Sequence, residues 1–396
     1  MPGPLSDVRV LDLSRVLAGP YAAMTLGDMG ADVIKIEQPG EGDETRAWGP
    51  PWAGGESAYY LAMNRNKRGI TLNLKTDGAR RVFLDLVRRS DILIENFKAG
   101  TLERMGLGDA TLWEANPRLI HASITGFGPV GPYRDYPGYD FVIQAMAGIM
   151  SITGEPEGQP MKVGVAIVDV TAGLFTVTAL LGALHARGTT GRGQRVDVSL
   201  LESAMAWLAN VGSNYLIAGQ DARRFGNAHP SIVPYQDFRA KDRPLALALA
   251  NPRQFRRFCE LAGRPDLADD PRYATNADRV AHREELIAEL QAIIGARTAD
   301  EWLRLLNDGG IPAGPINTVA QAFQDPQVQA LGIVHTLPHP TAGEVRVVGP
   351  PFRLSDTPVA PRSAPPLHGE HTAAVLADVL GLDAAAVAAL RAEGAI

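Results

Sequence analysis

The sequence predicts an α/β protein in which a parallel sheet covered by helices forms one domain and a smaller α+β domain follows. Short runs rich in Val, Ile and Leu alternate with helical segments through the first half, a pattern typical of a parallel sheet buried on both faces. The 396 residues exceed the roughly 250–300 residues that one hydrophobic core usually serves. From about Phe225 the composition changes, so we place the second domain there.

The elements of the first half follow in order. We expect strands at 8–14, 31–37, 70–74, 91–97 and 117–125. Helices are expected at 17–30, where a small-residue segment ends on glycine, and at 77–90. GVAIV (164–168) is expected to form a further strand before a helix from Asp169 towards His185, and RVDVSLLESAMAWL (195–208) a strand passing into a helix. This succession predicts a large Rossmann-like domain.

The second half is expected to be α+β and then to return to the large domain. Strands are expected at 229–238 and 244–250, and helices at 252–263, 278–296 and 298–310, the last with a capping Thr298. EVRVVGPPFRLS (344–355) indicates a short strand pair, and HTAAVLADVLG (371–381) a final helix. We therefore expect a large domain from 1–210 and 330–396, and a small domain at 225–318.

Charge and cysteine content exclude several function classes. The 38 Lys and Arg residues against 44 Asp and Glu give a formal net charge of −6, which argues against a nucleic acid or a membrane surface as partner. The single cysteine, Cys259, forms no internal disulfide, which fits a reducing, cytoplasmic location. No secretory signal is visible at the start of the sequence.

Two motifs resemble known binding sites without meeting their requirements. GFGPVG (126–131) has the spacing of a dinucleotide fingerprint, but Pro129 and Pro132 prevent the helix that such a site needs. The eight histidines show no metal-ligand spacing, and LHGEH (367–371) fits a capping turn equally well. We therefore expect neither a dinucleotide nor a metal site, and no tightly bound cofactor.

Basic side chains gather near the expected strand ends, where ligands of doubly wound sheets bind. The set comprises Lys35, Arg46, Arg65, Lys67, Arg68, Lys75, Lys98 and Arg104. Such a cluster suits an anionic, phosphate-bearing ligand. A solvated basic surface explains the same charges equally well.

One carboxylate stands out in the most apolar stretch, VGVAIVDVTAGLFTVTALLGALHA (163–186). This stretch is long enough to span a bilayer, but Asp169 and three glycines interrupt it, so a buried strand and core helix are the preferred interpretation. A buried unpaired carboxylate is costly, so Asp169 is expected to be paired, to cap a helix or to take part in chemistry. At a helix N-terminus, the helix dipole and free N–H groups would stabilise the anion.

Several motifs, in order and over essentially the whole chain, resemble the class III CoA-transferases, the formyl-CoA and carnitine CoA-transferase group. They are VLDLSRVLAGPYAAMTLGDMGADVIKIE, NRNKRGITLNLK, ENFKAGTLERMG, GYDF (138–141), VAIVDVTAG, TGRGQRVDVSLLE and GIPAGPI (311–316). The resemblance implies CoA transfer with Asp169 as the covalent nucleophile, through an aspartyl anhydride and an aspartyl-CoA thioester. CoA and acyl-CoA are then substrates.

The resemblance also implies a set of CoA contacts. Those residues are Val16, Leu72, Lys75, Asn96, Phe97, Arg104 and Tyr139, with Arg46 as a further anion contact. Lys75 and Arg104 have the charge for the phosphates of CoA, and Phe97 could pack on its adenine or pantetheine. Core packing explains Val16 and Leu72 equally well.

Two alternative functions remain open. The α-methylacyl-CoA racemases share this fold, but they pair the aspartate with a histidine where this chain has Tyr139, a poor exchanging base at its ordinary pKa of about 10. A non-catalytic CoA-ester binding protein is the other alternative, and the intact Asp169 argues against it.

The second domain resembles that of members using succinyl-CoA and dicarboxylate acceptors, such as glutarate, hydroxymethylglutarate or malate, through NAHPSIVPYQDF (227–238). Arg223, Arg224 and His229 could neutralise a distal carboxylate, and ordinary surface roles fit them as well. Relatives form interlocked homodimers, so the resemblance implies an interlocked homodimer here.

Overall fold

The computed structural model describes residues 2–396, which form two compact units. The large unit contains the chain up to Ile149, Lys162–Ala218 and Leu331–Ile396, and the small unit contains Met150–Met161 and Gly219–Ala330. Each unit has its own hydrophobic core.

The large unit is built on a six-stranded, fully parallel sheet, as the sequence predicts. The order across the sheet is β5-β2-β1-β6-β7-β8. The strands are β1 (Arg9–Asp12), β2 (Asp32–Glu37), β5 (Lys67–Thr71), β6 (Ile92–Glu95), β7 (Ile120–Thr125) and β8 (Arg195–Ser199). Counted along the chain, this order runs 3-2-1-4-5-6, the doubly wound arrangement whose direction reverses between β1 and β6.

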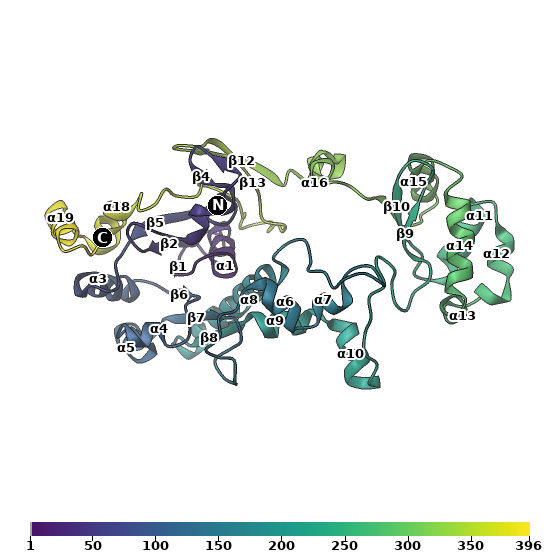
Figure 1. The fold of residues 1–396 in the computed structure, drawn as a ribbon. Coiled ribbons are helices and arrows are strands. Elements are labelled where there is room, and N and C mark those ends of the chain that lie inside the picture. The colour runs from purple at the N-terminus through teal and green to yellow at the C-terminus, as the bar shows by residue number, and fades with distance from the viewer. Residues whose placement is uncertain (1) are drawn as a thin grey trace. The chain divides into compact units, whose positions relative to one another are not determined.

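Helices cover both faces of this sheet (Figure 1). One face packs against α1 (Ala18–Asp28), α6 (Asp140–Met146), α8 (Ile167–Thr190) and α9 (Leu200–Trp207). The other face packs against α3 (Asp77–Arg88), α4 (Thr101–Arg104), α5 (Asp109–Ala115), α18 (Thr372–Leu380) and α19 (Ala384–Ala392). Gly173 lets α8 approach α1 closely, because a Cβ atom there would lie 2.8 Å from the carbonyl oxygen of Ala18.

Shorter elements complete the large unit. They are α2 (Ala58–Met63), α7 (Ile149–Ile152, at its boundary), α10 (Ala209–Ala218), a 3₁₀ turn at Glu44–Ala47, the hairpin β3 (Trp52–Ala53) and β4 (Glu56–Ser57), and the hairpin β12 (Val334–His339) and β13 (Gly343–Val348). The expected strand pair within 344–355 is wrong, because β13 pairs with the preceding β12.

The small unit is α+β. Its antiparallel sheet has the order β11-β10-β9, formed by β9 (Tyr235–Arg239), β10 (Pro244–Ala248) and β11 (Ala313–Pro315). The helices are α11 (Pro252–Leu261), α12 (Pro265–Asp269), α13 (Asn276–Ala281), α14 (Arg283–Ile294), α15 (Ala299–Asp308), α16 (Val319–Gln324) and α17 (Pro326–Leu331, at its boundary), with a 3₁₀ turn at Pro271–Tyr273. Thr298 caps α15 in a capping box, as expected. The expected single helix over 278–296 is interrupted at His282.

Candidate active site

The switch point of the large sheet brings two loops together at the carboxyl ends of neighbouring strands. β1 leads into residues 13–17 and β6 leads into residues 96–100. In open α/β sheets ligands bind outside the strand ends where the order reverses. The loops after β1 and β6 therefore mark the place where a ligand is expected.

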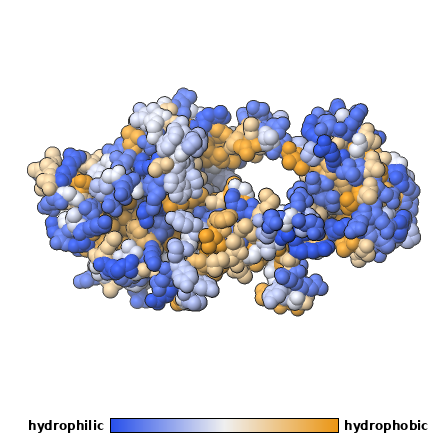
Figure 2. Space-filling model, in the orientation of Figure 1, coloured by the Kyte–Doolittle hydropathy of each residue, from blue (hydrophilic) through white to orange (hydrophobic). Residues whose placement is uncertain are grey.

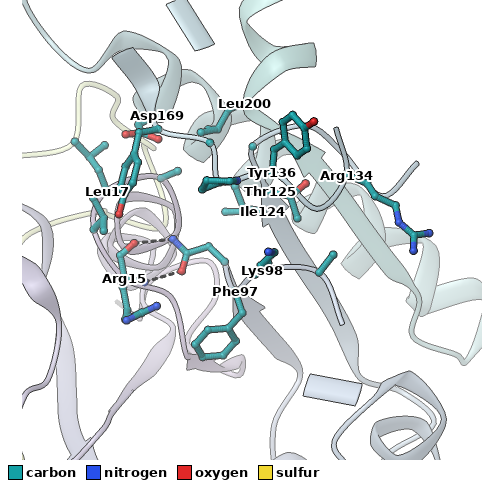
Figure 3. A pocket seen from close by; sticks show the side chains of 18 of the residues that line it. Arg15, Leu17, Phe97, Lys98, Ile124, Thr125, Arg134, Tyr136, Asp169 and Leu200 are labelled. Atoms are coloured by element: carbon teal, nitrogen blue, oxygen red, sulfur yellow. Dashed lines mark hydrogen bonds between the residues drawn. The ribbon is translucent and has the colours of Figure 1, made fainter. Parts of the chain in front are cut away.

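A cavity of about 280 Å³, here called the Asp169 cavity, lies at this switch point. Its lining comprises Arg15, Val16, Leu17, Ala18, Glu44, Asn96, Phe97, Lys98, Ala99, Ile124, Thr125, Gly126, Arg134, Tyr136, Pro137, Gly138, Tyr139, Asp169 and Leu200. Figure 3 shows Asp169 near Leu17 and Leu200, with Arg15 and Phe97 further along. Of the residues singled out in the sequence, this cavity brings together Val16, Asn96, Phe97, Lys98, Tyr139 and Asp169.

A second cavity of about 260 Å³, here called the Lys75 cavity, contains the predicted contacts Leu72, Lys75 and Phe97. Arg15 and Phe97 line both cavities. The Arg15 guanidinium carbon lies 5.7 Å from the centre of the Phe97 ring, so these side chains form a common wall.

Two predicted contacts lie outside both cavities. Arg46 binds the Glu37 carboxylate through Nε and Nη2, both at 2.8 Å, and its guanidinium carbon lies 3.7 Å from the centre of the Tyr60 ring. Arg104 is exposed on α4, where its guanidinium donates to the Thr101 hydroxyl at 2.9 Å. Arg104 lies beside Thr101 and Met105, which line the Lys75 cavity, whereas Arg46 has internal partners.

Several of the clustered basic side chains are buried rather than ligand-facing or solvated. Lys35 pairs with Asp43 at 2.9 Å and Lys67 with Asp12 at 2.8 Å, and all four side chains have 0% exposure. Arg65 is paired with Asp28 in the same way. The expectation that these charges either face a ligand or form a solvated surface is wrong for Lys35, Arg65 and Lys67.

Asp169 is the third residue of α8, and its carboxyl lines the Asp169 cavity. Burial, together with the nearby charge of Asp140, raises the pKa of Asp169 to about 7. The sequence predicted a stable anion at this helix end, whereas desolvation and the like charge of Asp140 favour the protonated form. The carboxyl is poised to exchange its proton near neutral pH.

Asp140, rather than Asp169, accepts hydrogen bonds from the free backbone N–H groups at the start of α8. The N-cap residue Ala166 makes no side-chain hydrogen bond, and Oδ1 of Asp140 accepts from the backbone N–H groups of Val168 and Asp169 at 2.8 and 3.3 Å. Gln144 donates to Oδ2 of Asp140 at 2.6 Å and accepts from the backbone of Val163 at 2.9 Å. The expected Asp169 cap and the expected strand over 164–168 are both wrong, since the helix already begins at Ile167.

Tyr59, on α2, does not line the Asp169 cavity, but its pKa depends on the Asp169 carboxylate there, and no pattern in the sequence indicated this link. Burial, then the charges of Asp169 and Asp140, raise the pKa of Tyr59 to about 12. The ring contacts Trp48 edge to face at 5.2 Å. Tyr59 therefore remains protonated at neutral pH and is a hydrogen-bond donor rather than a base.

Tyr139 enters the Asp169 cavity from the loop that precedes α6. Gly126 and Gly138 allow this loop to lie close to the end of β7. A Cβ atom on Gly126 would lie 2.6 Å from the Cα of Gly138, so a larger residue would clash there. Tyr139 is 59% exposed and occupies the position that would carry histidine in a racemase-type pair. The same loop brings Arg134 and Tyr136 to the cavity, and no sequence signal had marked them.

The turn after β1 is strained at the site. Val16 has a φ angle of 70°, a left-handed conformation that costs a β-branched residue roughly 1–3 kcal/mol. The Asn96 side chain bonds both backbone groups of Arg15: Oδ1 accepts from the Arg15 N–H at 2.8 Å, and Nδ2 donates to the Arg15 carbonyl at 2.7 Å (Figure 3). Asn96 thus fixes the turn, and this structural role is separate from its predicted contact with CoA.

In the small unit, the basic residues proposed for the distal carboxylate have internal contacts. Arg224 donates to the carbonyl oxygens of Glu155 at 3.1 Å and Gly158 at 2.8 Å. Arg223 lies over the Phe225 ring at 4.7 Å, and Nδ1 of His229 accepts from the Ser231 N–H at 3.0 Å. Arg224 therefore holds the segment 155–158 in place.

Comparison with known proteins gives a family. The model of CoA-transferase family III matches residues 5–372. The chain is 44% identical to a succinyl-CoA:glutarate CoA-transferase of Mus musculus, over 99% of this chain and 90% of that protein. It is 47% identical to a succinate–glutarate CoA-transferase of Agrobacterium fabrum, over 95% and 96% of the two chains. It is 37% identical to a succinyl-CoA–D-citramalate CoA-transferase of Chloroflexus aurantiacus, over 100% and 98%.

Solved structures show the same fold. A CaiB/BaiF family protein from Brucella suis superimposes with a TM-score of 0.86 at 44% identity, covering 96% of this chain and all of that one. Rv3272 from Mycobacterium tuberculosis superimposes with a TM-score of 0.85 at 32% identity, covering 94% and 99%.

Proposed function

Because the chain belongs to CoA-transferase family III, we propose that it transfers CoA from succinyl-CoA to a dicarboxylic acid such as glutarate, hydroxymethylglutarate or malate, with Asp169 as the covalent nucleophile. The observation that carries the chemistry is a carboxyl of pKa about 7 facing a cavity at the switch point of the sheet. Relatives named for glutarate and citramalate support a dicarboxylate acceptor.

The proposed reaction exchanges acyl groups through Asp169. Its ionised carboxylate attacks the thioester carbonyl of succinyl-CoA. The C–S bond breaks, CoA departs as the thiolate, and a mixed anhydride of Asp169 and succinate is formed. The thiolate then attacks the Asp169 carbonyl carbon, which releases succinate and forms an aspartyl-CoA thioester. The acceptor carboxylate attacks that thioester, giving a second anhydride and free thiolate. Attack of this thiolate on the acceptor carbonyl releases the new acyl-CoA and regenerates the Asp169 carboxylate.

The two cavities suggest how CoA would lie. The thioester must reach Asp169, while Lys75 and the neighbouring Arg104 supply positive charge for phosphates on the far side of the Arg15–Phe97 wall. Val16, Leu72, Asn96, Phe97 and Tyr139 line this path. Arg46 is left out of the proposed contacts, because Glu37 occupies its guanidinium.

Cations inside the Asp169 cavity suit the acceptor acid. Lys98, Arg134 and Arg15 line it, and the distal carboxylate of a dicarboxylic acid needs such a partner in a partly desolvated site. Arg15 pairs with Glu44 at 2.7 Å and Arg134 with Asp135 at 3.3 Å, so Lys98, which has no ion pair among the described residues, is the first candidate. Tyr59 stays protonated and its pKa responds to the charges of Asp169 and Asp140, so it is the candidate donor to the oxyanion that forms during acyl transfer.

We also propose that two copies of the chain associate. α8 is long and apolar enough to cross a membrane, but it packs in the large unit and only part of its apolar surface, such as Leu174 and Phe175, is exposed. Figure 2 shows hydrophobic side chains gathered over α6, α8 and α9. In α10, Leu216 and Ile217 are 83% and 86% exposed. Exposed apolar surface of this kind is typical of a protein interface. Light scattering after gel filtration measures the mass of the particle in solution and so tests whether two copies associate.

Mass spectrometry of the intact protein after brief incubation with succinyl-CoA tests the nucleophile. We expect a CoA-sized adduct, or after hydroxylamine or borohydride trapping a modification on Asp169, and neither in Asp169→Asn. Asp140→Asn is the matched control, because it removes a neighbouring carboxylate but retains the nucleophile and so retains the adduct.

Other outcomes would separate the alternatives. A modification on a residue other than Asp169 would refute the proposed nucleophile. Deuterium exchange at the α-carbon of a 2-methylacyl-CoA without any adduct would identify a racemase-type proton transfer. CoA binding with neither reaction would identify a CoA-ester binding protein.

A further inference from the structure

The turn at Arg15–Val16 is held by side chains from three other parts of the chain. Nζ of Lys35, on β2, donates to the Ser14 carbonyl at 3.0 Å. Oδ1 of Asp43 accepts from the Val16 N–H at 3.3 Å. Asn96 bonds both backbone groups of Arg15. The backbone of three consecutive residues is thus fixed from outside the turn.

Lys35 and Asp43 form one buried unit within this arrangement. Their side chains have 0% exposure and meet at 2.9 Å. Oδ1 of Asp43 also accepts from the Thr45 N–H at 3.0 Å and its hydroxyl at 2.8 Å, which starts the 3₁₀ turn at Glu44–Ala47. Although burial works against the charge, Lys35 and these hydrogen bonds lower the pKa of Asp43 to about 2. Asp43 is therefore ionised at neutral pH.

We propose that Lys35 and Asp43 are positioning residues for CoA, which hold Val16 in its left-handed conformation and so preform the wall shared by the Asp169 and Lys75 cavities. Without them, Val16 is expected to relax to a negative φ angle, because a β-branched residue disfavours φ near 70°. Arg15 and Val16 would then move, and Arg15 lines both cavities. The apparent affinity for CoA falls with the fraction of molecules in the competent conformation. This inference rests on the proposed function, since it concerns the CoA-binding wall.

Lys35 and Asp43 can be replaced together, because the neighbouring charged residues have ion-pair partners of their own. Lys67 stays paired with Asp12, and Arg46 with Glu37, when Lys35 and Asp43 are both replaced. Lys35→Met/Asp43→Ala therefore leaves no unpaired charge of this group in the core. Val16→Gly supplies the complementary change, because glycine adopts positive φ without a steric penalty.

Isothermal titration with CoA tests the proposal on four proteins: wild type, Lys35→Met/Asp43→Ala, Val16→Gly and the triple variant. The double substitution is expected to weaken CoA binding by about tenfold when Val16 is retained and by less than about threefold when it is combined with Val16→Gly. This coupling is the readout that general destabilisation would not produce. Equal losses in the two backgrounds, or no loss, would overturn the positioning role.

Two further variants complete the test. Arg65→Met/Asp28→Ala removes another buried pair, 5% and 2% exposed, that lines neither cavity; it is expected to lower the melting temperature without changing CoA affinity. If the Lys35/Asp43 double variant does not fold, Asp43→Asn, which keeps the volume of the side chain, is tested in the same two backgrounds with the same criterion. A wild-type protein that does not bind CoA would overturn the proposed function and this inference together, whereas a wild type that binds CoA with additive variants would overturn only the positioning role.

Discussion

Oδ1 of Asp140 lies 3.3 Å from the backbone nitrogen of Asp169, and the same oxygen lies 2.8 Å from that of Val168. One carboxylate therefore closes the N-terminal end of α8 and places its negative charge beside the carboxyl that faces the cavity. The N–H groups that would otherwise stabilise an Asp169 anion are used by Asp140. Asp169 is left with a pKa of about 7, because partial burial and the like charge of Asp140 both disfavour its anion.

This arrangement predicts the pH dependence of the transfer reaction. The nucleophile must be ionised, so kcat/KM for the acyl-CoA donor is expected to fall about tenfold per pH unit below pH about 7 and to level off above it. The profile of the free protein is measured at several pH values with a fixed donor. A profile that is flat from pH about 5 to about 8 would contradict a nucleophile with the raised pKa.

Asp140→Asn is expected to move the midpoint of that profile to lower pH. The substitution removes the like charge that raises the pKa of Asp169 and keeps an oxygen that can accept from Val168. It also places an amide opposite the amide donor of Gln144, which is expected to cost about 1–3 kcal/mol of stability. Asp140→Glu retains the charge and is the control, with an unchanged midpoint. An unshifted midpoint in Asp140→Asn would show that burial alone raises the pKa.

Asp169→Asn is expected to stabilise the folded protein at neutral and alkaline pH. The unfolded chain loses the Asp169 proton above its ordinary pKa of 3.8, but the folded protein loses it only above about 7. The folded state therefore binds more protons between these values, and wild-type stability falls as pH rises from about 4 to about 7. The advantage of Asp169→Asn over wild type should grow by on the order of 2–4 kcal/mol between about pH 4 and about pH 8.

Chemical denaturation at both pH values measures this difference. Asp85→Asn, which removes an exposed carboxylate on α3 of the same unit, is the control and should show no such growth. An equal advantage of Asp169→Asn at both pH values would contradict a buried carboxyl with a raised pKa.

Alternation of apolar runs and helical segments predicted the parallel sheet and its covering helices, because those patterns are local. The prediction failed where charge is buried. β5 covers Lys67–Thr71 rather than 70–74, since Lys67 has the character of a surface residue in the sequence but is neutralised inside by Asp12. The expected strand over 164–168 failed because apolar content alone does not distinguish a strand from the start of a buried helix.

The residues of the candidate site also fall into those that the sequence predicted and those that it did not. Resemblance marked Asp169 and most of the predicted cavity contacts, since these residues lie in short recognisable motifs. Asp140 and Tyr59 were missed as partners of Asp169, because they come from segments about thirty and more than a hundred residues away and meet it only through the fold. Arg46 looked like a free cation because its partner Glu37, nine residues earlier, ends β2 while Arg46 lies in the 3₁₀ turn at Glu44–Ala47.

Lys75→Met is expected to raise the KM for the acyl-CoA donor by about tenfold or more, since a charge-assisted hydrogen bond contributes about 1.5–3 kcal/mol. The side chain is exposed at the Lys75 cavity, so the melting temperature and the KM for the acceptor acid should not change. Lys162→Met removes an exposed charge outside both cavities and should leave the KM for the donor unchanged. A similar rise in KM for both substrates would show that Lys75 acts on the site as a whole.

Arg46→Met distinguishes two roles for Arg46, as a structural partner of Glu37 or as a contact of CoA. The guanidinium is nearly buried, at 12% exposure against 1% for Glu37, so its loss leaves an unpaired carboxylate in the lining of the Lys75 cavity. Breaking a buried ion pair is expected to cost about 3–5 kcal/mol in the free energy of unfolding. Because the freed Glu37 carboxylate lines the Lys75 cavity and repels phosphate, CoA affinity should fall only together with stability. Urea denaturation and titration with CoA measure the two quantities on one preparation. If stability is unchanged and CoA affinity falls, Arg46 exchanges Glu37 for a phosphate when CoA binds, and the internal pair seen here is the resting partner of a ligand-binding residue.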